Sequence, residues 1–207
     1  MVKQQEGQLM TEKYSADITA GSLLLSETKV VAGYLLDGKT FSEISKLVEK
    51  QNILQKRSVA AATRMYSLIR HRLQLFDKSL WSLIYYGDSE TARMATLAAT
   101  IKNSRILADF MLFILKEKYQ LFEKTLDKNL WNKFIIDCTM QSPDMPKWSE
   151  STAKKVGDSV YRILAETGYI SDTKTAQLQK VYIPPEVKKL LEKNNDTHIL
   201  KCMEVSL

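Results

Sequence analysis

The sequence contains few residues that break helices or cross-link a chain. Its 207 residues include seven glycines, four prolines, two cysteines and two histidines. This composition excludes collagen-like and low-complexity proteins. Cys138 and Cys202 form no CxxC pair, and neither His71 nor His198 lies near a recognisable carboxylate cluster. We therefore expect no disulfide framework, no metal site and no other cofactor.

Long apolar runs are also missing. The most apolar stretch, Leu107 to Leu115, is interrupted by Asp109 and is far shorter than the roughly 20 residues that a membrane-spanning helix needs. The opening residues, MVKQQEGQLM, lack the apolar segment and cleavage site of a secretory signal. We therefore expect a cytoplasmic protein that does not bind to a membrane.

The sequence does have a full complement of apolar residues and an excess of positive charge. Apolar residues make up 44% of the chain, which is enough for a sizeable core. Thirty Lys and Arg against 24 Asp and Glu give a formal charge of +6. This balance favours an anionic partner, with nucleic acid ahead of an acidic protein.

Helical periodicity begins after a polar stretch, residues 1–13, which we interpret as a flexible tail. An apolar segment ending at Leu36 precedes Thr40 and Glu43, whose spacing is that of a capping box and predicts the start of a helix. Ser58 is expected to cap a further helix. The apolar stripe of that helix is Ala62, Tyr66, Ile69, Leu73 and Phe76. Three helices in this order resemble a helix-turn-helix unit.

The third of these helices is predicted to be basic on its exposed side. At about 100° per residue, one sector opposite the apolar stripe holds a set of cations. They are Arg57, Arg64, His71 and Arg72. We expect this face to contact nucleic acid.

The middle of the chain, from Trp81 to about Leu126, is predicted to form the helical core. Asp109 lies inside its most apolar run, and Arg105 precedes it by one helical turn. We interpret Arg105 and Asp109 as a structural ion pair and not as catalytic groups.

A break in composition at Ser142-Pro143-Asp144-Met145-Pro146 predicts a boundary between an N-terminal helical domain, residues 14–140, and a C-terminal subdomain, residues 141–207. In the subdomain a helix ending at Gly168, strands at 169–170 and 178–183, and a last helix at 186–193 together outline a winged-helix unit with a short β-hairpin. A second basic surface is expected on its helix and wing. Its residues are Lys154, Lys155, Arg162, Lys174 and Lys180.

Motifs of enzymes are weakly represented. GYLLDGKT, Gly33 to Thr40, fits the pattern of a phosphate-binding loop, but Tyr34 to Leu36 are bulky and Thr40 is better explained as a helix cap. No serine lies in a G-x-S-x-G elbow, and the two histidines fall in different predicted units. We therefore predict no catalytic residue, with a small NTPase as a minor alternative.

Six uncommon segments are spread along the chain. They are NILQKRS (52–58), SLIRHRL (67–73), IKNSRILADF (101–110), MPKWSEST (145–152), RILAETGYI (162–170) and LKCMEV (200–205). Together they resemble the BrxA family of bacterial BREX phage-defence systems, over roughly Tyr14 to Val205. Arg57 and Arg105 lie within the shared segments.

This resemblance implies a small accessory protein of antiviral defence. It would be encoded beside a BREX methyltransferase, a phosphatase-like protein and a large ATPase, in a system that methylates adenine in host DNA and blocks replication of phage DNA. The resemblance also implies similarity to the all-helical NusB fold, which binds RNA. It brings no catalytic motif. The label of inner-membrane protein that the family has carried conflicts with the missing hydrophobic span.

We therefore predict a mainly α-helical, non-enzymatic protein: a helical bundle with a helix-turn-helix-like unit, followed by a winged-helix-like unit. Its predicted partner is double-stranded DNA, contacted through the phosphates with little sequence discrimination. Other BREX proteins are expected as further partners. A protein adaptor within the BREX complex, or RNA binding of the NusB type, are the alternatives, because they would use the same charges.

Overall fold

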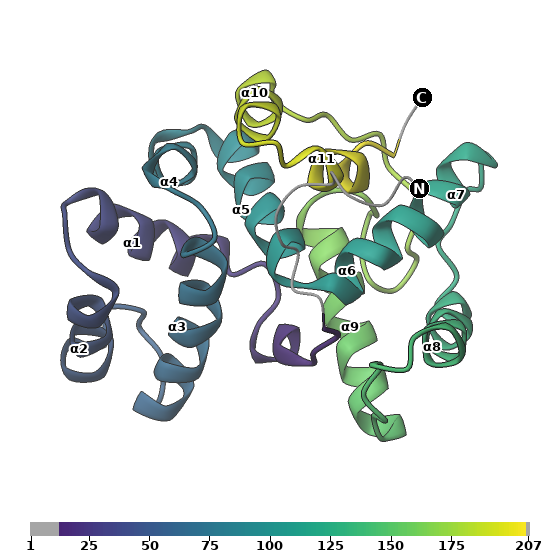
Figure 1. Ribbon diagram of the computed structural model, residues 1–207, viewed down its shortest axis with the longest axis horizontal. Helices are drawn as coiled ribbons and strands as arrows, with labels where there is room; N and C mark the ends of the chain where they lie inside the picture. The colour runs from purple at the N-terminus through teal and green to yellow at the C-terminus, as the bar shows by residue number, and fades with distance from the viewer. Residues whose placement is uncertain (1–12, 206–207) are drawn as a thin grey trace, which may run out of the picture.

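The computed structural model describes residues 13–205, so the predicted tail lies almost wholly outside the described residues. Within this range the chain forms a series of helices (Figure 1). In order they are η1 (Asp17–Ala20), α1 (Leu25–Leu36), α2 (Phe41–Gln51), α3 (Val59–Leu73), α4 (Lys78–Tyr86), α5 (Ser89–Asn103), α6 (Arg105–Asp109), the π-helix η2 (Phe110–Leu115), α7 (Lys116–Gln120), α8 (Asn129–Gln141), α9 (Glu150–Glu166), α10 (Pro185–Lys193) and α11 (Thr197–Met203).

The helix starts expected from the sequence are confirmed at α2 and α3. The Thr40 hydroxyl accepts a hydrogen bond from the Glu43 N–H at 3.2 Å, and the Glu43 carboxylate accepts one from the Thr40 N–H at 2.8 Å. The Ser58 hydroxyl accepts from the Ala61 N–H at 3.2 Å. Because Gly33 lies inside α1 and residues 13–32 contain no strand, GYLLDGKT does not have the strand–loop–helix context of a phosphate-binding loop.

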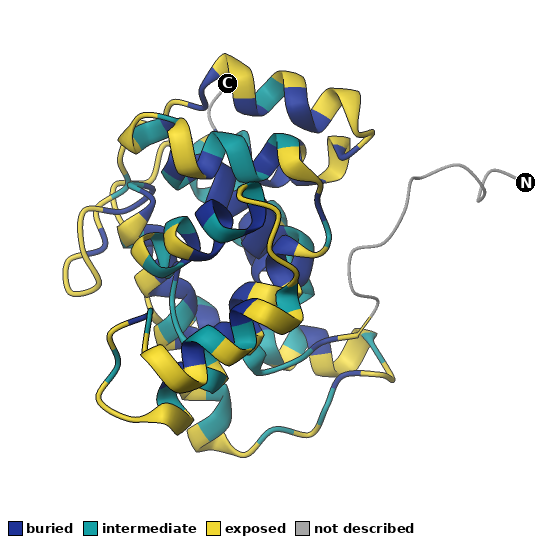
Figure 2. Cartoon of the chain, turned by 90° about the vertical axis from the view of Figure 1, so that its left-hand side faces the viewer, coloured by how far each residue is buried: buried dark blue, intermediate teal, exposed yellow. Residues whose placement is uncertain are grey.

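The centre of the molecule is built around α5. Most of its side chains are buried, and several are alanines, which let neighbouring helices approach closely from several sides. α6 packs on α5, and η2 follows α6 and contributes Phe110, which packs against Trp131 and Phe134 of α8. Figure 2 shows the buried residues gathered in the middle, with the exposed ones on the outer sides of the helices. The predicted core is confirmed at Leu107, Phe110, Met111 and Leu115, which are buried. The prediction is wrong at Leu121 and Phe122, which are exposed because they lie in the turn that follows α7.

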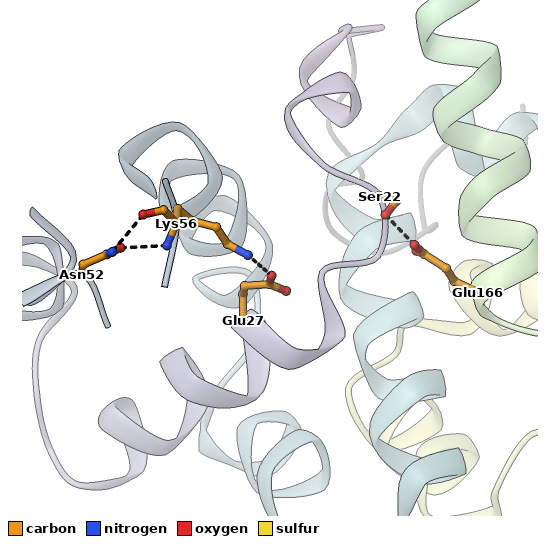
Figure 3. A network of polar contacts seen from close by, with 5 residues as sticks. All are labelled: Ser22, Glu27, Asn52, Lys56 and Glu166. Atoms are coloured by element: carbon orange, nitrogen blue, oxygen red, sulfur yellow. Dashed lines mark hydrogen bonds and ion pairs between the residues drawn. The ribbon is translucent and has the colours of Figure 1, made fainter. Parts of the chain in front are cut away.

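Two polar contacts hold α1 and the segment before it in place (Figure 3). The Ser22 hydroxyl donates to the Glu166 carboxylate at the end of α9, at 2.7 Å. On the other side, Lys56 forms an ion pair with Glu27 of α1. The Asn52 side chain holds the backbone of Lys56. Its carbonyl oxygen accepts from the Lys56 N–H, and its amide nitrogen donates to the Lys56 carbonyl, each at 2.9 Å. The loop that leads into α3 is thereby attached to α1, and α1 to α9.

The β-hairpin predicted after α9 is wrong, and with it the winged-helix unit. In residues 13–205 the only β-pairing is two isolated bridges, Ile170 with Leu178 and Thr125 with Gln177. The two arms pair at one bridge only, where the Ser171 N–H donates to the Gln177 carbonyl at 2.8 Å and the Gln179 N–H donates to the Tyr169 carbonyl at 3.0 Å. The other edge of the second arm bonds to the segment before α8, because the Leu178 N–H donates to the Lys124 carbonyl at 2.9 Å.

The C-terminal helices complete the fold. Ser149 caps α9, whose C-terminal end is followed by Gly168 at φ +80°, as its sequence position predicted. The expected helix near 186–193 is α10; α11 was not predicted. Both helices pack on α5, which belongs to the part of the chain before the expected domain boundary at residue 141. The domain boundary itself stays a prediction. Between residues 13 and 205, no helix is both long and apolar enough to cross a membrane.

Candidate nucleic-acid interface

An open groove of about 820 Å³ lies between α3 and α9, with η1 between them. In Figure 1 the purple η1 is visible between these two helices. Arg64 and His71 of α3 line one wall, and Lys155 of α9 lines the other. Two basic surfaces that are separate in the sequence therefore meet at one site.

The α3 wall is formed by residues that share one side of the helix. Arg64 and His71 are seven residues apart, which is two turns and about 10.5 Å along the axis. Both are exposed, and so is Arg57, which lies seven residues before Arg64 in the loop that leads into the helix. The expected sector of cations therefore holds for Arg64 and His71, whereas Arg57 precedes the helix and is not among the residues that line the groove.

Arg72 does not belong to this face, and its predicted place there is wrong. Its side chain is 1% exposed and points into the protein, where its guanidinium donates to the carbonyls of Leu23 and Ser22, each at 3.0 Å. Burial lowers the pKa of Arg72 to about 10, while the nearby carboxylates of Asp17 and Glu166 act to raise it. One residue beyond His71 the helix has turned by 100°, and the segment before α1 covers that side.

The predicted cations of α9 point in two directions. Arg162 is exposed and lies two turns after Lys155, so it shares the Lys155 side of the helix. Lys154 is turned by 100° and lines a separate pocket of about 360 Å³ between α8 and α9. Trp131 lies against Gly157 in that pocket, where a Cβ would come within 2.6 Å of the indole nitrogen.

Lys174 and Lys180 were expected on a basic wing. Both are exposed, but they lie on the loop between α9 and α10 and are not among the residues that line the groove. Lys174 belongs to a turn in which Asp172 accepts hydrogen bonds from the Thr175 hydroxyl and from the Thr175 and Lys174 N–H groups. These bonds lower the pKa of Asp172 to about 2, the Thr175 hydroxyl contributing most.

Several residues of the groove were not identified from the sequence. Thr63 and Ser67 line its α3 wall, Thr19 lies on η1, and Ala60 and Ala20 leave room between the walls. The α3 residues could have been found from the sequence, because small side chains recur at helical spacing on the side of the helix that carries Arg64. Arg70 is also exposed on α3 and was not included in the predicted basic face.

Asp17 is the acidic residue of the groove lining. One of its carboxylate oxygens accepts from the Ser15 hydroxyl at 2.7 Å, and the other from the Asn103 amide at 3.1 Å. These bonds fix the carboxylate between Ser15 and Asn103 of α5. The cations on the two walls therefore outnumber the one acid between them, and the groove favours an anion.

The Arg105 and Asp109 side chains lie elsewhere, on α6. They form an ion pair at 3.4 Å, and Asp109 also accepts a hydrogen bond from the Tyr14 hydroxyl at 2.8 Å. Burial and this hydrogen bond raise the pKa of Tyr14. Arg105 lies over the Tyr14 ring, 4.3 Å from its centre, so these three side chains join the N-terminal segment to α6.

Metal chemistry finds no support in the described residues, where no three His, Cys, Asp or Glu side chains are grouped to hold an ion. Cys138 and Cys202 are both buried, and burial raises the pKa of each thiol, that of Cys202 to about 12. At neutral pH these thiols stay protonated and are poor nucleophiles.

Comparison with known proteins gives a consistent result. The family model of BrxA matches residues 12–195. A protein of Paramagnetospirillum magneticum named BREX protein BrxA is 40% identical over 195 residues, which cover 94% of this chain and 98% of that protein. One of Escherichia coli O9:H4 with the same name is 29% identical, over 91% of this chain and 88% of its own. The crystal structure of an uncharacterized protein from Magnetospirillum magneticum superposes with a TM-score of 0.87 at 39% identity, covering 94% of this chain and all of that one.

Proposed function

The chain belongs to the BrxA family of BREX phage-defence proteins, and from that premise we propose that it is a non-enzymatic component that binds double-stranded DNA through the groove between α3 and α9. The observation that carries this proposal is the meeting of Arg64, His71 and Lys155 at one groove. These residues come from distant parts of the sequence, and Asp17 is the one acid beside them in the lining.

The dimensions of α3 support DNA as the partner. An α-helix with its side chains is about 10–12 Å wide, and the major groove of B-DNA is about 12 Å wide, so the exposed side of α3 fits against it. Arg64 and Lys155 are basic side chains, and such side chains contact mainly phosphates. We therefore expect binding with little dependence on base sequence.

A salt titration tests the proposal. Nuclease-treated protein is titrated into a fluorescein-labelled 24-base-pair duplex at several salt concentrations, and anisotropy gives the dissociation constant. Each phosphate contact contributes about 0.9 to the slope of log affinity against log salt. Arg64→Gln and Lys155→Gln should each lower that slope by about 0.9. Lys189→Gln, which removes an exposed cation from α10, is the matched control and should leave it unchanged.

Two results would contradict the proposal. One is no binding of the duplex at moderate salt. The other is an equal slope for the wild type, Arg64→Gln and Lys155→Gln. Duplex RNA and single strands, run in the same titration, test the RNA alternative. The adaptor alternative predicts that other BREX proteins co-purify with this chain after nuclease treatment and are lost in the Arg64→Gln variant.

A further inference from the structure

We infer that the groove holds the sugar–phosphate backbone of one DNA strand, and that the hydroxyl groups of Thr63 and Ser67 donate hydrogen bonds to its phosphate oxygens. This inference rests on the proposed function, because it names what enters the same groove. It assigns a binding role to two neutral residues that no charge pattern identifies.

The two hydroxyls lie on the same wall as the basic residues of α3. Thr63 precedes Arg64, and Ser67 follows it by three residues, so both fall on the side of α3 that carries Arg64 and His71. Four residues separate Thr63 and Ser67, which is about 6 Å along the helix axis. Together with Arg64 and His71 they form a row of hydrogen-bond donors along the groove.

Both hydroxyls are free to donate. Serine and threonine inside a helix commonly bond to the carbonyl four residues back. Four other helix residues of this protein do so: Thr96, Thr100, Thr139 and Ser159, at 2.7–2.9 Å. Among the hydrogen bonds of residues 13–205, by contrast, the Thr63 and Ser67 side chains make none. Their donors are therefore open to the groove or to water.

The size of the groove fits one strand and not a whole duplex. Its volume of about 820 Å³ is in the range of a small-ligand site. With α3 against the major groove, one phosphate strand runs along each flank of the helix, and one of those flanks is the wall that faces α9. Lys155 then contacts the same strand from the other side. Asp17, held by Ser15 and Asn103, keeps the phosphates toward the α3 wall by repulsion.

A neutral donor and a cation leave different signatures in a salt titration. A cation that contacts a phosphate releases counterions, so its loss lowers the slope of log affinity against log salt. A hydroxyl releases none, so its loss lowers affinity equally at every salt concentration. Thr63→Val/Ser67→Ala should therefore weaken binding of the duplex about tenfold with an unchanged slope, while Arg64→Gln lowers the slope by about 0.9.

The matched control is Thr197→Val/Ser82→Ala, which removes the same two groups from α11 and α4 outside the groove. It should bind as the wild type does. Ser67 is exposed and Thr63 is half-buried, so the groove variant should keep its far-UV circular dichroism and its Tm, and a loss of affinity would not reflect unfolding.

Methylphosphonates test the phosphate contact directly, because they neutralise single phosphates. Since binding has no fixed register, they are placed at alternate phosphates of both strands. They should weaken the wild type and weaken Thr63→Val/Ser67→Ala less, since the shared contact is already lost.

Several outcomes would overturn the inference while leaving the proposed function in place. The first is wild-type affinity in Thr63→Val/Ser67→Ala, the second is a lowered salt slope in that variant, and the third is additive effects of the variant and the methylphosphonates. Each counts provided that the wild type binds and Arg64→Gln lowers the slope. Failure of the wild type to bind duplex DNA would instead overturn the proposed function, and this inference with it.

Discussion

Replacing Arg72 with alanine should destabilise the protein strongly, although the sequence pattern assigns this residue to the surface. Its guanidinium donates two hydrogen bonds of 3.0 Å to the Ser22 and Leu23 carbonyls and is 1% exposed. Hydrogen bonds from a charged group are worth about 1.5–3 kcal/mol each. Alanine would leave both carbonyls without these partners and open a cavity, so we expect the free energy of unfolding to fall by about 3–5 kcal/mol.

The assay is urea unfolding followed by circular dichroism at 222 nm, with a thermal melt beside it. In a chain of this size, Tm shifts by about 2–4 °C per kcal/mol, so Tm should fall by roughly 6–20 °C. Arg72→Lys keeps the charge but loses the planar pair of donors, so its loss of stability should be intermediate.

Arg70→Ala is the matched control. Arg70 lies on the same helix, is exposed, and carries the same charge, so both variants lower the net charge by one. Its removal should change the free energy of unfolding by no more than about 0.5 kcal/mol. If Arg72→Ala were as stable as Arg70→Ala, the argument from buried hydrogen bonds would be refuted.

Three further predictions concern local structure. Gly157→Ala should lower the free energy of unfolding by about 1–3 kcal/mol despite the higher helix propensity of alanine, because its Cβ would lie 2.6 Å from the Trp131 indole nitrogen. A higher Tm with unchanged tryptophan fluorescence would contradict this prediction. Thr40→Ala should cost about 1 kcal/mol by removing the capping box, and Thr40→Ser should restore most of it in the same melt. The hydrogen bonds from Thr175 lower the pKa of Asp172, so they stabilise its turn above about pH 4 and are lost as the pH falls toward 2. The Asp172 carboxyl carbon, followed by NMR, should therefore titrate near pH 2. A midpoint at the ordinary value of about 3.9 would contradict the structure.

The sequence by itself determined most of the helices and the starts of α2 and α3. The capping box of Thr40 and Glu43 and the Ser58 cap depend on hydrogen bonds between residues three apart, so they can be read locally. The Arg64 and His71 side of α3 follows from helical period alone. The same local reasoning missed α11 and predicted a β-hairpin, whereas the two arms pair at a single bridge and the second arm also bonds to the distant segment before α8.

Only the tertiary structure decided which of these charges form a site. Nothing near Arg72 in the sequence shows that Ser22 and Leu23, some fifty residues earlier, cover its side of α3. Nor does any spacing place Lys155 opposite Arg64, because their separation depends on how η1 lies between α3 and α9. Helical period sets the direction of a side chain about its own axis, whereas burial and convergence depend on packing between helices, which only the folded chain defines.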